Sequence, residues 1–321
     1  MACRLWYMNA DFEMELAANS PHYKCPESFQ NINRRLAEKL LWIAAPGDAL
    51  LIDAPWSSQL EEFASGRNVK LVDSPDPAKF HEHQFTPWGW TPTSKAKGIA
   101  TGAAVLNPDI DVVRMVNSKI WSFRLECEMG TAILGSCVVS TFDQIEDSVA
   151  RACPGPQDKW VIKSPFGFAA RDRVLGRGPI MAHAQAQWVK RRLGMNENLI
   201  FQPWLEVERE YGIVMELEKN GAFRILGVSD LKTNGAGTGI GYYLRRSIAP
   251  VRRRTLESVA ETVAERLTNA GYFGPVGIDA LEHSGGLLPL LEVNARYTMG
   301  FVALAVGLET SPTSLEFWST K

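Results

Sequence analysis

The chain has 321 residues, of which 45% are hydrophobic and 22% charged, and its formal net charge is −2. A chain of this length is expected to form two or three structural units. The near-neutral charge excludes a general polyanion-binding surface, so no nucleic-acid partner is expected. The five cysteines are widely spaced without a CxxC pair, which favours free thiols in a reducing compartment over disulfides or a zinc site. Neither an apolar leader segment nor an apolar run of about 18 residues is present, so we expect a cytoplasmic protein with no membrane partner.

Residues 1–115 have the pattern of a first α/β unit. Ser28 is a candidate N-cap for a helix over residues 29–45, which carries a one-sided apolar stripe. Short apolar strands are predicted at 49–53 and 69–72, with a helix-like segment between them. This alternation of helix and strand favours a parallel sheet.

An aromatic segment follows at residues 85–92, where Pro87 and Pro92 bracket Trp88 and Trp90. The two prolines predict a loop. If the tryptophans are exposed, they are candidates for a wall of the substrate site. The alternative is that they fix the loop onto the domain, and both can hold.

A helix is predicted over residues 116–130, with Ser118 as its N-cap and Gly130 at its end. Lys119 lies in its first turn, where the helix dipole mildly disfavours a cation. A lysine at this position is either a solvated surface residue or a ligand of an anion. The helix alone does not decide between them.

A short apolar strand over residues 160–163 ends in Lys163 and leads into residues 164–174, which are rich in small residues and arginine. Backbone N–H groups of such a loop can hold phosphate groups. The GxxxxGK[ST] pattern is absent, so this is not a Walker A loop. A mobile hairpin with ordinary surface charges explains the same pattern.

Residues 198–207 are predicted to form a strand that passes into a hinge at Gln202, where backbone groups could pair with the edge of an adenine. Glu206 and Glu210 follow, and a further strand is predicted at 212–217. The glutamates alternate with other residues, so an exposed strand face explains them equally well.

A strand is next predicted at 225–229, followed by a flexible glycine-rich loop over 230–241 that contains Lys232. Arg245 and Arg246 come after the loop and indicate either a solvated edge or an anion site. The sequence leaves these two alternatives open.

The clearest helix of the chain is predicted to begin at Thr255 as its N-cap and to end at Gly271. The arginines at 252–254 precede it and are expected to be solvated. This helix leads into the segment that carries the strongest functional signal.

That segment contains two apolar runs around Gly285-Gly286, a pattern typical of a β-hairpin with a two-residue turn. A turn centred on the two glycines places Asp279 opposite Glu292 and puts Asn294 on the same face. Opposed carboxylates destabilise a plain sheet, whereas two carboxylates and an amide oxygen suit Mg²⁺. The alternative is two solvated carboxylates on an open sheet face.

Taken together, these features resemble the ATP-grasp superfamily. The spacing of Asp279, Glu292 and Asn294 is similar to that of D-alanine–D-alanine ligases, and Ala295-Arg296 looks like the Asn-Pro-Arg of carbamoyl phosphate synthetase and carboxylase members. The resemblance covers roughly residues 116–305.

The fold that the resemblance implies is an α/β (α+β) ATP-grasp fold with an N-terminal Rossmann-like domain. It predicts an N-terminal domain over 1–115, a small lobe with the phosphate loop over 116–200, and a large lobe over 201–321. It also implies ATP and Mg²⁺, with two ions, as cofactors.

The resemblance further implies roles for individual residues. Lys119 and Lys163 would hold the α- and β-phosphates. The loop over the phosphates would include Ser164, Gly167 and Arg171, the adenine hinge Gln202, Pro203, Trp204 and Leu205, and the ribose site Glu206 or Glu210. Asp279, Glu292 and Asn294 would bind the metal, Lys232 the γ-phosphate, and Arg296 the acyl phosphate and the tetrahedral intermediate, with charge supplied by Arg245 and Arg246.

Two positions depart from the family pattern. Ala169-Ala170 stands where many members have glycines, and Gly277 stands where D-alanine ligases have an arginine. A stiffer phosphate loop is expected from the first, and the second is why Arg296, Arg245 or Arg246 would have to supply the missing charge.

The activity implied is that of an ADP-forming ligase, which activates a carboxylate as an acyl phosphate and joins it to an amine. The expected partners are a small-molecule carboxylate (an amino acid or peptide) and an amine, and a homodimer is compatible with the resemblance. The alternatives are a bicarbonate-activating carboxylase, a simple kinase and a non-catalytic nucleotide-binding protein.

Overall fold

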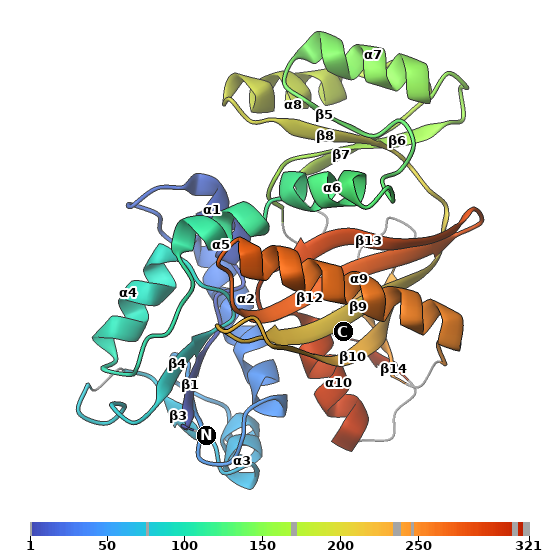
Figure 1. Cartoon of the computed structure of the whole chain (residues 1–321). Helices are drawn as coiled ribbons and strands as arrows, with labels where there is room; N and C mark the ends of the chain where they lie inside the picture. Colours follow the sequence, from blue (N-terminus) through green and yellow to red (C-terminus); the bar gives the residue numbers. More distant parts are fainter. Residues whose placement is uncertain are drawn as a thin grey trace.

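The computed structural model describes residues 2–74, 77–167, 172–233, 239–244 and 247–309, together with the backbone of a strand at Ser314–Glu316. These residues form three separate β-sheets with helices packed on them (Figure 1). In the part of the chain described, no helix combines the length and apolar character needed to cross a membrane.

The first sheet belongs to the N-terminal unit and has the order β3-β2-β1-β4. Its strands are β1 (Arg4–Tyr7), β2 (Ala49–Leu51), β3 (Lys70–Val72) and β4 (Gln84–Pro87), and all three pairings are parallel. The predicted parallel sheet is therefore confirmed. The loop predicted over residues 85–92 was wrong at its start, because residues 85–87 belong to β4, which pairs with β1.

The helices of this unit are α1 (Phe12–Ala18), α2 (Glu27–Ala37), the 3-10 helix η1 (Glu38–Trp42), α3 (Ser58–Gly66), α4 (Pro92–Ala100) and α5 (Ile110–Val116). The single helix predicted over 29–45 is α2 continued as a tighter 3-10 turn. Ser28 is not its N-cap, because Pro26 holds that position and Ser28 lies in the first turn.

The second sheet is antiparallel with the order β5-β8-β6-β7. Its strands are β5 (Cys137–Val139), β6 (Lys159–Lys163), β7 (Arg173–Arg177) and β8 (Leu199–Pro203). Helices α7 (Phe142–Ala152) and α8 (His183–Gly194) cover it at the top of Figure 1. Ile145 and Val189 of these helices share a buried cluster with Trp160 and Phe201 of the strands.

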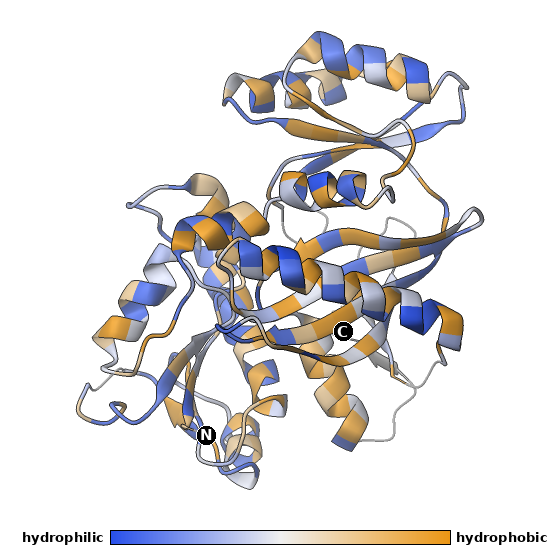
Figure 2. Cartoon of the chain, in the orientation of Figure 1, coloured by the Kyte–Doolittle hydropathy of each residue, from blue (hydrophilic) through white to orange (hydrophobic). Residues whose placement is uncertain are grey.

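The third sheet has the order β13-β12-β9-β10-β11-β14. Its strands are β9 (Val207–Leu217), β10 (Phe223–Thr233), β11 (Gly239–Tyr243), β12 (Gly274–His283), β13 (Gly286–Asn294) and β14 (Ser314–Glu316). Helix α9 (Pro250–Asn269) packs on one face, where it buries Leu256 and Val263 against Ile213 and Ile278. Helix α10 (Met299–Glu309) packs on the other face, where Phe301 and Val214 share a cluster. In Figure 2 much of the strand length is coloured hydrophobic, whereas the outward side of α9 carries hydrophilic residues.

Two predicted boundaries in this sheet were wrong. Helix α9 begins at Pro250, a residue suited to the first turn, so Thr255 lies inside the helix, where its hydroxyl donates to the Val251 carbonyl. Strand β10 continues to Thr233, so Lys232 stands on a paired strand rather than in the glycine-rich loop.

The predicted domain limits do not coincide with the limits of the sheets. Strand β8 crosses the predicted limit at residue 200, and α6 (Lys119–Glu128), predicted within the small lobe, packs against β13 of the third sheet. The division at 115 and 200 stays a prediction.

Candidate active site

The centre of the candidate site is the β12–β13 hairpin. Its turn consists of Ser284 and Gly285, not of the two glycines, because Gly286 already pairs with His283. An irregularity further along the hairpin shifts the register, and Asp279 then pairs with Glu292 as predicted. Among the described residues, no group of three or more His, Cys, Asp and Glu side chains is placed to hold a metal ion.

Asn294 connects the hairpin to Arg296. The Asn294 amide donates to Asp279 Oδ2 at 3.1 Å, and the Arg296 guanidinium donates to Asn294 Oδ1 at 3.0 Å. Burial and the neighbouring carboxylates of Glu292 and Glu210 raise the pKa of Asp279 to about 7. The hairpin therefore carries a half-buried concentration of negative charge that a cation would stabilise.

Lys119, in the first turn of α6, offsets part of the negative charge of the hairpin. Its ammonium forms an ion pair with Glu292 and donates to the Gly167 carbonyl at 3.3 Å. Burial lowers the pKa of Lys119, but Glu292 and Glu13 outweigh that effect, so the net shift is upward. Lys119 is thus a charged residue of the site and not a solvated surface lysine.

Glu13 of α1 contacts residues of the candidate site, and the sequence did not reveal it. Its buried carboxylate accepts hydrogen bonds from Arg296 at 2.6 Å and from the Gly167 backbone N–H at 3.1 Å. Burial raises the pKa of Glu13, but the positive charges of Lys119 and Arg296 lower it by more. The pKa of Glu13 therefore lies below its usual value. Glu13 therefore connects the N-terminal unit to Arg296, two residues beyond the hairpin, and to the predicted phosphate loop.

Lys163, at the end of β6, points to the hinge strand β8. Its ammonium donates to Gln202 Oε1 at 2.6 Å. Burial lowers the pKa of Lys163 to about 8, although Glu292 and Glu126 favour the charged form. Glu126 is itself fully buried on α6, and burial raises its pKa to about 8.

A cavity lies beside the hinge, and most of the residues predicted to bind adenine and ribose line it. Its polar lining comes from β6, β7, β9 and the hinge: Lys163, Arg173, Glu210, Gln202 and Trp204. The apolar lining consists of Ile133, Val161, Pro203, Leu205, Val207, Leu281 and Leu291. Arg173 was not predicted; its guanidinium lies 5.8 Å from the centroid of the Trp204 ring.

The two candidate ribose ligands, Glu206 and Glu210, have different surroundings in the structure. Glu210 lines the hinge cavity, and burial raises its pKa against the opposing effects of Thr233 and Arg173. The Glu206 side chain is 77% exposed and forms an ion pair with Lys159 at 2.5 Å. Only Glu210 is therefore placed beside the hinge cavity.

The predicted phosphate loop is anchored where it leaves β6 and enters β7. The Ser164 hydroxyl donates to Glu197 at 2.7 Å, and Arg192 forms ion pairs with Glu197 and Asp172. The Ser164 backbone N–H also donates to the Asp172 carbonyl at 3.0 Å.

The remaining predicted residues fall into two groups. Lys232 lies on β10 opposite Gly241 of β11. Arg171, Arg245 and Arg246 lie outside the described residues.

Trp88 and Trp90 are 4% and 9% exposed, so they are not an exposed wall. Trp88 pairs through its backbone with Tyr7 and Tyr297, which fixes the segment between the first sheet and the end of the hairpin. Both tryptophans nevertheless line a cavity between the N-terminal unit and the third sheet.

Comparisons with known proteins extend these observations. No family model matches the chain. The chain is 23% identical to a butirosin acyl-carrier protein–L-glutamate ligase from Niallia circulans over an alignment of 325 residues. The alignment covers 95% of this chain and 74% of that protein.

Solved structures with the same arrangement include biotin carboxylase from Campylobacter jejuni, with a TM-score of 0.60 and 11% identity over 85% of this chain and 64% of that one. N5-carboxyaminoimidazole synthetase from Staphylococcus aureus has a TM-score of 0.54 and 11% identity over 98% and 80% of the two chains. D-alanyl-alanine synthetase A from Vibrio cholerae has a TM-score of 0.50 and 14% identity over 66% of each chain. The chain therefore has the ATP-grasp fold that its motifs predicted.

Proposed function

We propose that the protein is an ADP-forming ligase that activates a carboxylate as an acyl phosphate and joins it to an amine. The observation that carries this proposal is the convergence of separate segments on one site. Lys119 from α6 pairs with Glu292 of the hairpin, and Arg296 donates to Asn294 at the end of it. Glu13 from α1 in turn pairs with Arg296. Such a concentration of paired charge suits phosphoryl transfer, in which positioning and electrostatics supply most of the catalysis.

The hinge cavity is our proposed nucleotide site. Backbone groups of residues 202–205 would pair with the adenine, and the apolar lining would enclose its faces. Glu210 is the better candidate for the ribose hydroxyls, because Glu206 is exposed and paired with Lys159.

The phosphates would extend from this cavity toward the hairpin. Lys163 lines the cavity and Lys119 pairs with Glu292, so the two lysines mark a path between the two places. Ser164 and Gly167 flank that path as part of the loop between β6 and β7. We assign Lys232 to the γ-phosphate.

The hairpin residues fit a magnesium ion. Two carboxylates and the Asn294 amide oxygen form the hard oxygen donor set that Mg²⁺ prefers. Burial, and then the carboxylates of Glu292 and Glu210, raise the pKa of Asp279, and a bound cation would oppose that shift. When bound, Mg²⁺ would offset the charge of the triphosphate and of the attacking carboxylate. Asp279, Glu292 and Asn294 would hold it.

Arg296 would stabilise the negative charge that develops when the acid attacks the γ-phosphate and when the amine attacks the acyl phosphate. Its guanidinium is held by Glu13 and Asn294, at 2.6 and 3.0 Å, so its direction is fixed before substrates bind. Glu13 also bonds Gly167, which brings the phosphate loop next to the same guanidinium. Exclusion of water from this space would protect the acyl phosphate from hydrolysis.

We propose an amino acid as the acid. The relative from Niallia circulans is named as a ligase of an acyl-carrier protein and L-glutamate. A carrier-protein acceptor is therefore the first variant of the proposal to include in a test.

The test is a screen for ADP release by the purified protein with Mg-ATP and pairs of amino acids, dipeptides and amines, with a carrier protein as one acceptor. The proposal expects ADP release that requires both an acid and an acceptor. Release with bicarbonate as the sole acid would contradict it in favour of a carboxylase. Release with a single substrate that ends as a stable phosphate ester would indicate a kinase.

A further inference from the structure

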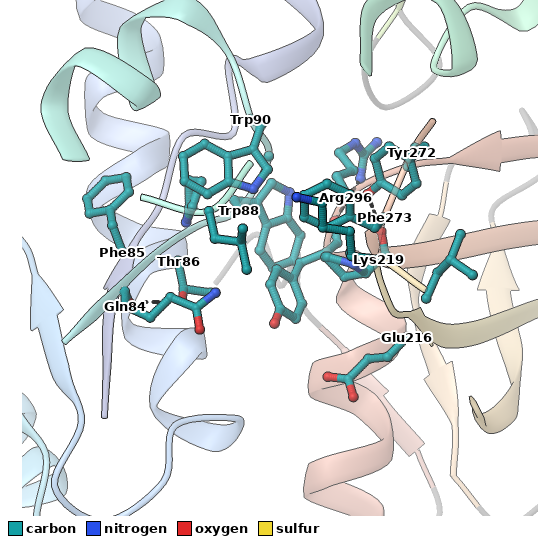
Figure 3. Close-up of a pocket in the computed structure, with 18 of the residues that line it drawn as sticks. Gln84, Phe85, Thr86, Trp88, Trp90, Glu216, Lys219, Tyr272, Phe273 and Arg296 are labelled. Carbon is teal, nitrogen blue, oxygen red and sulfur yellow. Dashed lines mark hydrogen bonds between the residues drawn. The ribbon is translucent and has the colours of Figure 1, made fainter. Parts of the chain in front are cut away.

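A second cavity lies between the N-terminal unit, at β1 and β4, and the third sheet. It has a volume of about 320 Å³, which is at the lower end of the range for small-molecule sites. One wall comes from Gln84 to Trp90, and the opposite wall comes from residues after β9 and α9, including Lys219 and Phe273. Figure 3 shows these two groups of side chains facing each other across the cavity.

The cavity has rigid aromatic walls. Phe85, Trp88, Trp90, Tyr272 and Tyr297 all line it, and each is at most 9% exposed. Phe85, Trp90 and Tyr272 belong to one buried cluster that joins the first sheet to the third. Flat aromatic walls held in this way favour a ligand with a flat apolar body.

Two cations at the cavity have no carboxylate partner among the described residues. The Arg4 side chain donates to the Tyr297 hydroxyl at 3.1 Å and lies over the Trp6 ring. The Lys219 ammonium lies 5.9 Å from the centroid of the Phe273 ring and forms no ion pair in the part of the chain described. Arg296, by contrast, is already paired with Glu13.

Acidic residues at the same cavity limit the charge that it can accept. Glu216 and Glu218 also line it, and Glu216 has a partner in Arg224 at 3.1 Å. Three cationic and two anionic side chains leave an excess of one positive charge. This balance suits a monoanion better than a phosphate dianion.

We propose that this cavity binds a small monocarboxylate with a flat apolar body, at a site separate from the hinge cavity. The carboxylate would lie between Arg4 and Lys219, and the apolar body would lie against Trp88. The proposal needs no nucleotide, so it stands or falls independently of the ligase activity.

The cavity is also connected to the candidate active site. Arg296 and Ala295 form part of its wall, and Asn117 accepts a hydrogen bond from the Ala295 N–H at 2.9 Å. A bound carboxylate could act in either of two ways that share this chemistry, as a substrate of the reaction or as a ligand that is not consumed.

The test measures binding of indole-3-acetate to the nucleotide-free protein by calorimetry, with neutral indole-3-acetamide as the matched ligand. Binding of the acid at least ten-fold tighter than the amide is expected. Lys219→Glu reverses a charge at the cavity and should weaken binding of the acid at least ten-fold. The control Lys95→Glu makes the same charge change at an exposed lysine on α4 and should leave binding unchanged.

A second pair of variants tests the location. Leu106 lines the cavity and is 49% exposed, so Leu106→Trp should fill its mouth and abolish binding. Ile99→Trp places the same side chain at a 62% exposed position outside the cavity and should not affect binding. Equal binding of acid and amide, or binding that survives both Leu106→Trp and Lys219→Glu, would overturn the proposal. Consumption of the acid with ADP release would identify it as a substrate, whereas binding without consumption would identify it as a separate ligand.

Discussion

Asp279 lies opposite Glu292 because β13 contains two more residues than β12 over the same stretch of the hairpin. Near the turn Leu281 pairs with Leu288, so Ala280 on one strand faces the three residues 289–291 on the other before the Asp279–Glu292 pair. The second strand includes Pro289, which has no N–H to donate to a regular ladder. A bulge of this kind re-aims side chains, and here it brings two carboxylates face to face. The relationship that defines the candidate metal site is therefore a product of an irregularity in the sheet.

Glu292→Gln tests that pair. The substitution removes one charge of the proposed metal site and the ion pair with Lys119. We therefore expect ADP release to fall by about 100-fold or more and the Mg²⁺ concentration needed for half-maximal rate to rise. Steady-state assays across Mg²⁺ concentrations measure both. The control is Glu261→Gln on the exposed side of α9, which should behave as the unmodified protein. Unchanged activity in Glu292→Gln would assign the hairpin a structural role.

Nucleotide affinity should weaken at alkaline pH. Burial lowers the pKa of Lys163 to about 8 in the nucleotide-free protein, and a bound phosphate would raise it. The lysine's contribution to affinity is therefore complete below pH 8 and is lost as the pH rises above 8, by up to about ten-fold per unit. Calorimetric titration with ATP at pH 7, 8 and 9 measures the slope.

Lys163→Arg is the matched control for that titration, since arginine stays charged throughout the range. Its affinity for ATP should be nearly independent of pH, whatever its absolute value. An equal slope in the two proteins would show that another group titrates.

The Asp279–Glu292 pairing could be predicted because its signals are local. The 13-residue and two-residue spacings that join Asp279, Glu292 and Asn294 follow from strand alternation within one hairpin. The predicted turn was wrong by one position, and the bulge compensated for that error, which the apolar pattern could not reveal. Lys119 was recognised from a helix start, although its partner was not.

The residues that were missed depend on contacts between distant parts of the chain. Glu13 and Arg296 are 283 positions apart, and neither the helix pattern around Glu13 nor its charge indicates that contact. Strands β1 and β4 were missed because four-residue segments carry little periodicity, and both of these include polar residues. Lys232 was placed in a loop because the following glycines hid the extension of β10.

Glu13 should stabilise the fold through Arg296. Glu13→Ala would leave a guanidinium that is 12% exposed without its carboxylate, at a cost of about 3–5 kcal/mol. A double-mutant cycle with Arg296→Ala should show strong coupling, because the second substitution removes the unpaired charge. Additive losses in urea unfolding would contradict the pairing.

The same contact predicts a direction with pH. The pKa of Glu13 is lowered in the folded protein, so its contribution is complete above the usual carboxyl pKa and is lost as the pH falls through the folded value. The stability difference between the protein and Glu13→Gln should therefore shrink as the pH is lowered below about 4. Glu27→Gln, at an exposed position on α2, serves as the control.

Glu126 should change the pH dependence of the folding stability in the direction opposite to Glu13. Burial raises the pKa of this carboxyl to about 8, so stability is greatest below the unfolded pKa of about 4.3 and falls as the pH rises toward 8. Glu126→Gln removes the titration and should be more stable than the unmodified protein at pH 7 by up to about 3 kcal/mol, with little difference at pH 4. A gain that does not change with pH would contradict this account.

The most direct test of the proposed ligase is the fate of a carboxylate oxygen. Once an acid that supports ADP release is found, the reaction is run with that acid labelled with ¹⁸O in its carboxylate, and the phosphate is analysed by mass spectrometry. Attack of the carboxylate on the γ-phosphate transfers one of its oxygens, so one ¹⁸O atom should appear in each inorganic phosphate released. Unlabelled phosphate, with or without label in AMP, would contradict an acyl phosphate at the Asp279–Glu292 site.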